Sequence, residues 1–211
     1  MQHLEYAVIS AAGLGSRLEM NIPKCLLEVN GRKIIDYQLE LLKKVPNIRV
    51  VVGFMEEEVI KYIKSVRQDV LFVRNPDFNK TTNAYSLYLG SYDIKKPFLS
   101  LDGDLLISRQ EFRKFLGICK KDNLVGIGHA KTEDAVFVDF DGQRIKTFSM
   151  KKKFDYEWTG LVYLSNIKIQ KNKKYVFNVL EDYLPIKAHV IDSFEIDTPS
   201  DFKLAQNGFK F

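Results

Sequence analysis

The chain has 211 residues, 45% of them hydrophobic, which suits one domain spanning 1–211 and leaves no length for a second large one. Its formal net charge of +5 comes with scattered lysines, which excludes the basic stripe of a nucleic-acid-binding protein. Two isolated cysteines exclude a zinc or disulfide framework, and the lack of any apolar run of about 18 residues predicts a cytoplasmic protein without a signal peptide or membrane partner.

The first half alternates short apolar runs with amphipathic ones, which is typical of a parallel sheet covered by helices on both faces. Strands are expected over 6–10, 49–53, 70–74, 97–101 and 124–130. Helices are expected over 34–45, 56–66, 81–92 and 108–120. Such β-α-β units connect through right-handed crossovers.

The second half predicts a mixed sheet. Residues 135–140 and 144–150 read as a hairpin, with Asp141-Gly142 in a type I′ turn. Further strands are expected over 158–164, 188–191 and 194–196, and helices over 174–183 and 200–206. The predicted fold class is therefore α/β, a Rossmann-like and mostly parallel sheet with a mixed C-terminal part.

The stretch from Ala11 to Lys24 is the most distinctive feature of the chain. Gly13 and Gly15 let several backbone N–H groups converge on one anion, and Arg17 and Lys24 add positive charge. The pattern matches neither a Walker loop nor a dinucleotide fingerprint. A polyphosphate site is predicted, with an ordinary strand-to-helix turn as the alternative.

An acidic pair forms the second feature. Asp102 and Asp104 flank Gly103 at the carboxyl end of a predicted strand, where ligands of open α/β sheets gather. Their carboxylates are hard oxygen ligands of the kind that bind Mg²⁺. An Asp-rich turn is the alternative, and glycosyltransferases also carry a DxD pattern.

Three segments together carry a resemblance. Residues 11–17 (AAGLGSR), the pair Pro23-Lys24 and residues 31–35 (GRKII) resemble the N-terminal signature of the nucleotidyltransferases that make activated sugars and activated alcohols. Lys33 stands where that family often has proline. The resemblance implies the nucleotide-diphospho-sugar transferase fold, with a catalytic domain alone.

The segment 194–201 is similar to the family's distal Ile-Asp-Thr-Pro-Glu-Asp element. The resemblance implies that Asp104 and Asp197 hold Mg²⁺, with Asp102 nearby. Alternatively, Asp197 caps the last helix at Pro199.

The same resemblance places Arg17 at the β- and γ-phosphates and Lys24 at the α-phosphate, so that the catalytic residues are Lys24, Arg17 and Asp104. An acceptor phosphate is largely ionised at neutral pH, because its second pKa is about 6, and needs no general base. His3, His129 and His189 are accordingly expected to be structural or exposed.

The nucleotide pocket is inferred from Asn83-Ala-Tyr-Ser86, which is similar to an Asn-x-x-Ser element of the phosphocholine cytidylyltransferase branch. A helix start with polar caps is the alternative. The Ala11-Ala12 pair looks more like the pyrimidine branch and favours CTP. The nucleotide-binding residues are predicted to be Ala11, Ala12, Gly13, Gly15, Ser16, Asn83, Ser86 and Asp102.

For the acceptor, Glu157 and Gly160 match the family's Glu-x-x-Gly turn. Trp158, with Tyr156, is a candidate to enclose a quaternary ammonium, although a Trp that begins a strand is commonly core. One lysine of 151–153, with Lys152 as the named candidate, is expected to contact the acceptor phosphate unless this run is simply exposed.

The leading hypothesis is a Mg²⁺-dependent cytidylyltransferase that joins CTP to a phosphorylated acceptor and releases pyrophosphate. The acceptor would be phosphocholine-like, a phosphoamidate or phosphonate, or a sugar phosphate, for decoration of a surface polysaccharide. The alternatives are a sugar-1-phosphate uridylyl-, thymidylyl- or guanylyltransferase, a DxD glycosyltransferase and a non-catalytic nucleotide sensor. A monomer or a homodimer is expected.

Overall fold

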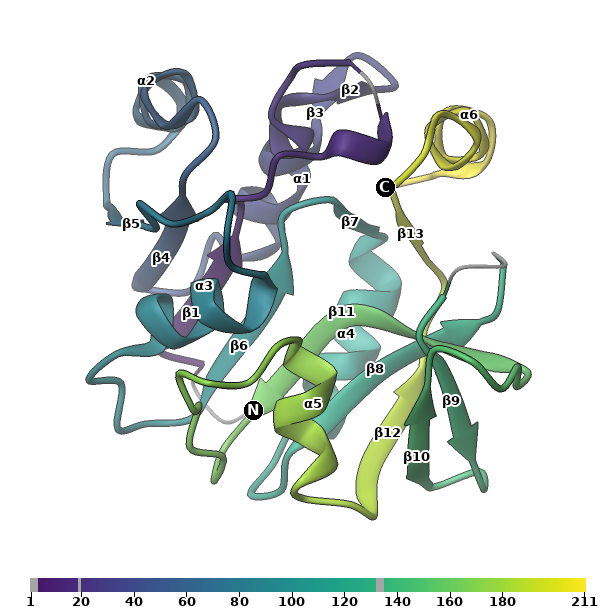
Figure 1. Ribbon diagram of the computed structural model, residues 1–211. Helices are drawn as coiled ribbons and strands as arrows, with labels where there is room; N and C mark the ends of the chain where they lie inside the picture. The colour runs from purple at the N-terminus through teal and green to yellow at the C-terminus, as the bar shows by residue number, and fades with distance from the viewer. Residues whose placement is uncertain (1–3, 19, 132–134) are drawn as a thin grey trace.

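The computed structural model describes residues 4–18, 20–131 and 135–211 (Figure 1). Within these ranges nine strands form one sheet in the order β5-β4-β1-β6-β11-β8-β12-β10-β9, and β11 also pairs with β9. The strands are β1 (Tyr6–Ser10), β4 (Asn47–Val52), β5 (Val70–Arg74), β6 (Phe98–Asp102), β8 (Leu124–His129), β9 (Phe137–Phe140), β10 (Arg144–Ser149), β11 (Tyr156–Leu164) and β12 (Ile186–Val190).

The first half of the sheet is parallel, and its inner strands β4, β1 and β6 are covered on both faces. Strands β5, β4, β1 and β6 run parallel to one another. Helices α1, α2 and α4 pack on the face that presents Ala7 and Ile9, whereas α3 and α5 cover the face that presents Val8 (Figure 1). The helices are α1 (Ile34–Leu41), α2 (Glu56–Val66), α3 (Asn83–Ser91), α4 (Arg109–Ile118), α5 (Val176–Glu181) and α6 (Pro199–Gly208).

The second half of the sheet is mixed. Strand β11 runs antiparallel to both β6 and β8, while β12 is parallel to β8. Strands β10 and β9 complete this edge in antiparallel pairs. The predicted α/β class, with helices on both faces, a parallel first part and a mixed second part, is confirmed.

The predicted type I′ turn between β9 and β10 is wrong. The loop has three residues, 141–143, and of these Gly142 alone has a positive φ, of 96°. The reason is local, because the Asp141 carboxylate accepts the backbone N–H groups of Gln143 and Arg144 at 3.0 and 2.8 Å. A short polar side chain that bonds the backbone two residues on stabilises this wider loop.

A type I′ hairpin does occur at a place where none was predicted. Strands β2 (Glu28–Val29) and β3 (Arg32–Lys33) are joined by Asn30 and Gly31, whose φ angles are 52° and 76°. Asn-Gly is the preferred pair for this turn. Helix α1 then ends at Leu41, short of the predicted residue 45, since the backbone of Leu42 already departs from helical geometry with φ of −90° and ψ of 11°. Pro46 also disfavours a helical conformation at residue 45.

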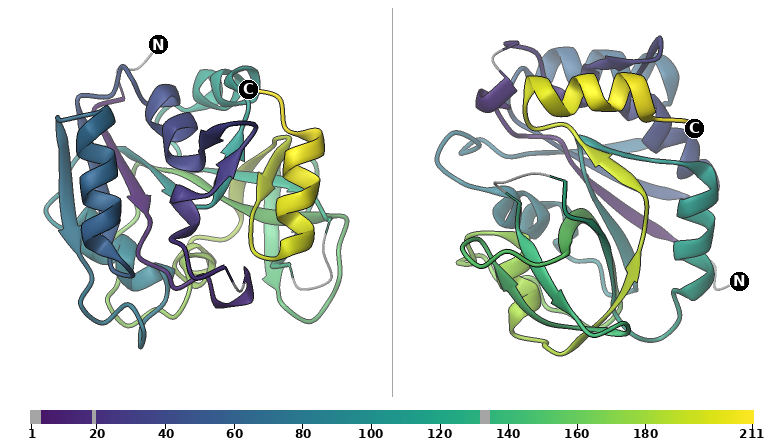
Figure 2. Two further views of the ribbon diagram at one scale, coloured as in Figure 1. Left: turned by 90° about the horizontal axis from the view of Figure 1, so that it is seen from above. Right: turned by 90° about the vertical axis from the view of Figure 1, so that its right-hand side faces the viewer.

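The C-terminal helix packs against a segment near the start of the chain. Helix α6 contacts the N-terminal segment through a cluster that contains Leu18, Leu27, Val29, Ala205 and Phe209. The two views in Figure 2 show this helix beside the N-terminal hairpin. Among the described residues, none of the helices is both long and apolar enough to cross a membrane. The packing of α6 against this N-terminal segment brings residues 197–201 close to the glycine-rich loop.

Candidate active site

A cavity of about 850 Å³ opens at the carboxyl ends of β1 and β6, between the two halves of the sheet. Its walls come from the glycine-rich loop, the start of α3, the turn after β6, strand β11 and the segment that leads into α6. The predicted site residues that line it are Ala11, Ala12, Gly13, Gly15, Arg17, Lys24, Asn83, Ser86, Asp102, Asp104, Glu157, Trp158 and Asp197. Ser16 and Lys152 do not line it.

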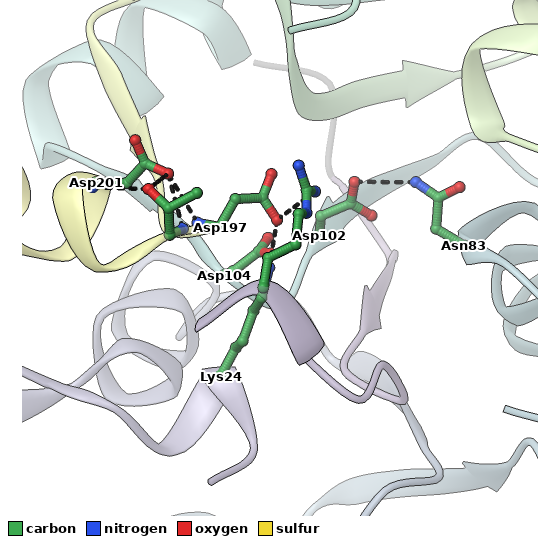
Figure 3. Close-up of polar contacts among 8 residues, drawn as sticks. Lys24, Asn83, Asp102, Asp104, Asp197 and Asp201 are labelled. Carbon is green, nitrogen blue, oxygen red and sulfur yellow. Dashed lines mark hydrogen bonds and ion pairs between the residues drawn. The ribbon is translucent and has the colours of Figure 1, made fainter. Parts of the chain in front are cut away.

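Lys24 lies at the centre of the site. Its Nζ donates to Asp104 Oδ2 at 2.7 Å and to Asp197 Oδ1 at 2.5 Å (Figure 3). Arg17 Nη2 lies 2.9 Å from the same Asp197 oxygen. The two aspartates that were predicted to share a metal ion, and the two cations that were predicted to hold phosphates, therefore form one cluster.

The Lys24 side chain is only 16% exposed. Burial by itself would lower its pKa, but the charges and hydrogen bonds of Asp104 and Asp197 raise the pKa of Lys24 well above its ordinary value. Lys24 is therefore a permanent cation at neutral pH. Gly15 leaves room for its stem, since a Cβ at that position, where φ is +62°, would lie 3.0 Å from Lys24 Cγ.

A small antiparallel ladder brings Asp104 and Asp197 together. Strand β7 (Leu105–Ile107) pairs with β13 (Ser193–Glu195), with Leu105 opposite Glu195. The ladder continues for one more bond, from the Ile196 N–H to the Asp104 carbonyl at 3.3 Å. Neither the strand β7 nor this pairing was predicted, because three apolar residues directly after a turn are too short to show a period.

Asp197 does not cap the last helix. Thr198 is the N-cap of α6, and its side chain accepts the Asp201 N–H at 3.3 Å while Asp201 Oδ2 accepts the Thr198 N–H at 2.8 Å. This capping box provides hydrogen-bond acceptors for the backbone N–H groups at the start of α6, with Pro199 at the first helical position as predicted. The Asp197 carboxylate is left to face Lys24 and Arg17.

Two further carboxylates lie behind this cluster. Burial, reinforced by the charge of Asp104, raises the pKa of Asp102 to about 8. Burial likewise raises the pKa of Glu195 well above its ordinary value, and the charges of Asp104 and Asp102 add to that effect. Glu195, which lines the cavity, was not predicted. It lies in a short strand whose sequence gives no sign of its position in the fold.

Gly160 is required by these two acids. Its φ is +72°, and an added Cβ would lie 2.9 Å from Asp102 Cβ and 3.1 Å from Glu195 Oε1. Any side chain here would have to displace one of the carboxylates. The glycine of the predicted Glu-x-x-Gly turn therefore has a steric explanation within the protein.

Asn83 and Ser86 both belong to internal hydrogen-bond networks. The Asn83 amide donates to Asp102 Oδ2 at 3.3 Å and its oxygen accepts the Val176 N–H at 3.2 Å. Ser86 is 5% exposed, and its hydroxyl accepts from Asn75, a buried residue that was not predicted. Both predicted residues line the cavity, but their polar groups already have protein partners.

The acceptor side of the site differs in part from the prediction. Trp158 is 7% exposed in β11 and lines the cavity, but Tyr156 stacks on His129 at 5.0 Å between ring centroids. Lys152 Nζ lies 4.7 Å from the centre of the Phe154 ring. A lysine that was not predicted, Lys131, lines the cavity instead.

Both the side-chain ammonium and the backbone N–H of Lys131 donate hydrogen bonds within the protein. Its Nζ donates to the Ser193 carbonyl at 2.6 Å, and its N–H donates to Glu157 Oε2 at 3.1 Å. Of the histidines, neither His129 nor His189 lines the cavity, and His3 lies outside the described residues. Burial lowers the pKa of His189.

Comparison with known proteins agrees with this geometry. A model of the family described as the MobA-like NTP transferase domain matches residues 7–155, well over half of the chain. The chain belongs to this family. The predicted nucleotidyltransferase relationship is thus confirmed.

Two curated relatives are cytidylyltransferases. The choline-phosphate cytidylyltransferase of Streptococcus pneumoniae is 36% identical over 115 residues, which are 52% of this chain and 49% of the relative. The CTP:phosphoglutamine cytidylyltransferase of Campylobacter jejuni is 31% identical over 138 residues, 63% of this chain and 52% of the relative. The chain therefore matches about half the length of each.

Solved structures show the same fold over nearly the whole chain. The inositol-1-phosphate CTP transferase from T. maritima has a TM-score of 0.75 at 19% identity and is covered to 99%, as is this chain. The CTP:phosphocholine cytidylyltransferase from Streptococcus pneumoniae has a TM-score of 0.75 at 22% identity, with 98% of this chain and all of that one covered. At these identities the likeness concerns the fold.

Proposed function

We propose that this protein is a Mg²⁺-dependent cytidylyltransferase. An oxygen of the acceptor's phosphate attacks the α-phosphorus of CTP, the bond to the β-phosphate oxygen breaks, and pyrophosphate leaves. The observation that supports this most directly is the cluster of Arg17, Lys24, Asp104 and Asp197 next to the glycine-rich loop. It combines cations for a triphosphate with carboxylates for a divalent ion.

The residues suit Mg²⁺. Asp104 and Asp197 already direct carboxylate oxygens at one cation, the Lys24 ammonium, and carboxylates are the hard ligands that Mg²⁺ prefers. In the described part of the chain, no group of three or more His, Cys, Asp or Glu has metal-binding geometry, so phosphate and water oxygens would complete the shell. When bound, the ion would neutralise charge on the phosphates.

The chain's own residues supply positioning and positive charge. Arg17, whose side chain is 56% exposed, would bind the β- and γ-phosphates, and Lys24 would stabilise the charge that builds on the α-phosphate. The acceptor's phosphate is already ionised at neutral pH, with a second pKa of about 6, and needs no base. This agrees with a cavity that no described histidine lines.

CTP is the proposed nucleotide because both cytidylyltransferase relatives exceed 30% identity. Glu157 and Trp158 in the cavity wall are compatible with an acceptor that carries a positive charge, such as a phosphocholine-like molecule. An activated product of this kind could serve in the decoration of a surface polysaccharide.

A sugar-1-phosphate nucleotidyltransferase is the second candidate. A relative named bifunctional protein GlmU, from Methanococcus vannielii, is 27% identical over 85% of this chain and 43% of the relative. This match extends further along the chain than the cytidylyltransferase matches do.

The test is a matrix of CTP, UTP, GTP and dTTP against phosphocholine, phosphoglutamine and hexose 1-phosphates, scored by pyrophosphate release. We expect release with CTP and a non-sugar phosphate, loss of release with EDTA and its return with Mg²⁺. Preference for UTP, GTP or dTTP with a sugar phosphate would favour the second candidate. In a parallel reaction supplied with a nucleotide sugar, consumption of that sugar without pyrophosphate release would identify a glycosyltransferase and refute the proposal.

A further inference from the structure

Gln38 is a completely buried polar residue in the middle of α1. Its amide nitrogen donates two hydrogen bonds, to the Asp102 carbonyl at 2.8 Å and to the Leu105 carbonyl at 2.9 Å. These two carbonyls lie immediately before and after Gly103 and Asp104. One side chain therefore spans both ends of the acidic turn.

The same turn has two other attachments, both through the backbone. The Gly103 N–H donates to the Ser10 carbonyl of β1 at 2.9 Å, and the Ile196 N–H donates to the Asp104 carbonyl at 3.3 Å. The turn is also tight against β1, since a Cβ at Gly103 would lie 2.8 Å from the Ser10 oxygen. The hydrogen bonds of Gln38 attach the turn on a third side, to helix α1.

The polar head of Gln38 is not explained by packing. Its Oε1 atom is buried and has no hydrogen-bond partner among the residues that the structure describes. An unpaired buried carbonyl destabilises a fold, and an apolar side chain of similar size would avoid that cost. What an apolar residue could not supply is the pair of N–H donors.

We propose that Gln38 is a positioning residue for the active site. It holds the Asp102–Asp104 turn so that the Asp104 carboxylate faces the cation it shares with Asp197. The role of that cation site rests on the proposed function, whereas the effect of Gln38 on the turn can be measured without turnover. A site assembled from distant segments gains accuracy when a buried side chain locks the backbone that carries its carboxylate.

The test compares Gln38→Met with Tyr37→Phe. Met keeps the volume but removes both donors. Tyr37 is the adjacent residue of the same helix, and its hydroxyl donates to the Val29 carbonyl at 2.7 Å, away from the turn. Each variant thus loses a buried side-chain donor, but only the donor lost from Gln38 bonds residues 102–105.

The first measurement is amide hydrogen exchange of residues 102–107 without ligand. For Gln38→Met we expect exchange about tenfold faster in this segment than in wild type or Tyr37→Phe, as the loss of one or two hydrogen bonds implies. The second is Mn²⁺ binding in the presence of CTP, followed by electron paramagnetic resonance. Here Gln38→Met should weaken Mn²⁺ binding about tenfold on the same basis, with Tyr37→Phe unchanged.

If Gln38→Met does not fold, Gln38→Glu takes its place, because it keeps the shape and donates at most one hydrogen bond. Equal exchange of residues 102–107 and equal Mn²⁺ binding in the variant and in Tyr37→Phe would overturn the inference. Failure of the proposed function has a different signature, namely no pyrophosphate from the wild-type protein while the exchange difference persists.

Discussion

The two walls of the cavity are built in different ways. The cationic wall, with Arg17 and Lys24, comes from one continuous stretch of chain after β1. The acidic wall joins Asp104 to Asp197 through the ladder between β7 and β13. Lys24 links the two, since it is bonded to both carboxylates. Arg17 and Lys24, which we propose to bind phosphates, are thus a local feature of one segment, whereas Asp104 and Asp197, which we propose to hold the metal ion, come together only in the complete fold.

Removing Lys24, which connects the two walls, should have the largest effect on activity. Lys24→Ala takes away the cation next to the α-phosphate, and loss of one such electrostatic group lowers kcat by about 10²-fold or more. Pyrophosphate release measures this, with circular dichroism to verify the fold. Lys61→Ala, on the exposed side of α2, is the control and should keep full activity. Near-normal turnover in folded Lys24→Ala would mean that the cationic wall does not serve catalysis.

Adding a side chain next to the buried carboxylates of the acidic wall should have a smaller effect on activity. Gly160→Ala places a methyl group 2.9 Å from Asp102 Cβ on a backbone with φ of +72°. We expect a loss of about 1–3 kcal/mol of unfolding free energy from the strained backbone, and a fall in activity of about tenfold as the carboxylates shift.

Gly142→Ala is the matched control for this change. Its φ is +96°, and an added Cβ would meet nothing within 4 Å. It should lower stability to a similar extent while kcat stays at the wild-type value. Parallel losses of activity in the two variants would show that strain, and not the carboxylates, is responsible.

The last effect concerns the pH dependence of the unfolding free energy, and not turnover. Burial raises the pKa of Asp102 from 3.8 to about 8, so the folded state keeps a proton that the unfolded chain releases. Its contribution to stability is complete below the unfolded pKa and is lost as the pH rises towards about 8. Compared with Asp102→Asn, the wild-type protein without metal should therefore lose unfolding free energy between these values. Urea unfolding at a series of pH values measures the difference. Equal pH dependence of the unfolding free energy in the two proteins would show that the pKa of Asp102 is not raised by the fold.

The sequence was informative wherever a pattern was long or local. Helix α2 and strand β5 have the predicted bounds, Glu56–Val66 and Val70–Arg74, because a full helical period and a continuous apolar run are strong signals. The glycine-rich loop could be interpreted for the same reason, since its residues act together within one segment.

Long-range features could not be read in this way. Gln38 is one of several polar residues in a helical run, beside Asp36 and Glu40, and only the fold shows that it faces the acidic turn. Glu195 depends likewise on the pairing of β13 with β7. By contrast, Asn30-Gly31 carried a clear hairpin signal, but strands of two residues gave it no flanking pattern.

We propose that a triphosphate binds at the glycine-rich loop and contacts a divalent ion held by Asp104 and Asp197. A crystal structure with CTP and Mn²⁺, with the ion located by its anomalous signal, tests it most directly. We expect one ion coordinated by Asp104 and Asp197, with the phosphates contacted by Arg17 and Lys24. An ion bound elsewhere, or a triphosphate away from residues 11–17, would contradict it.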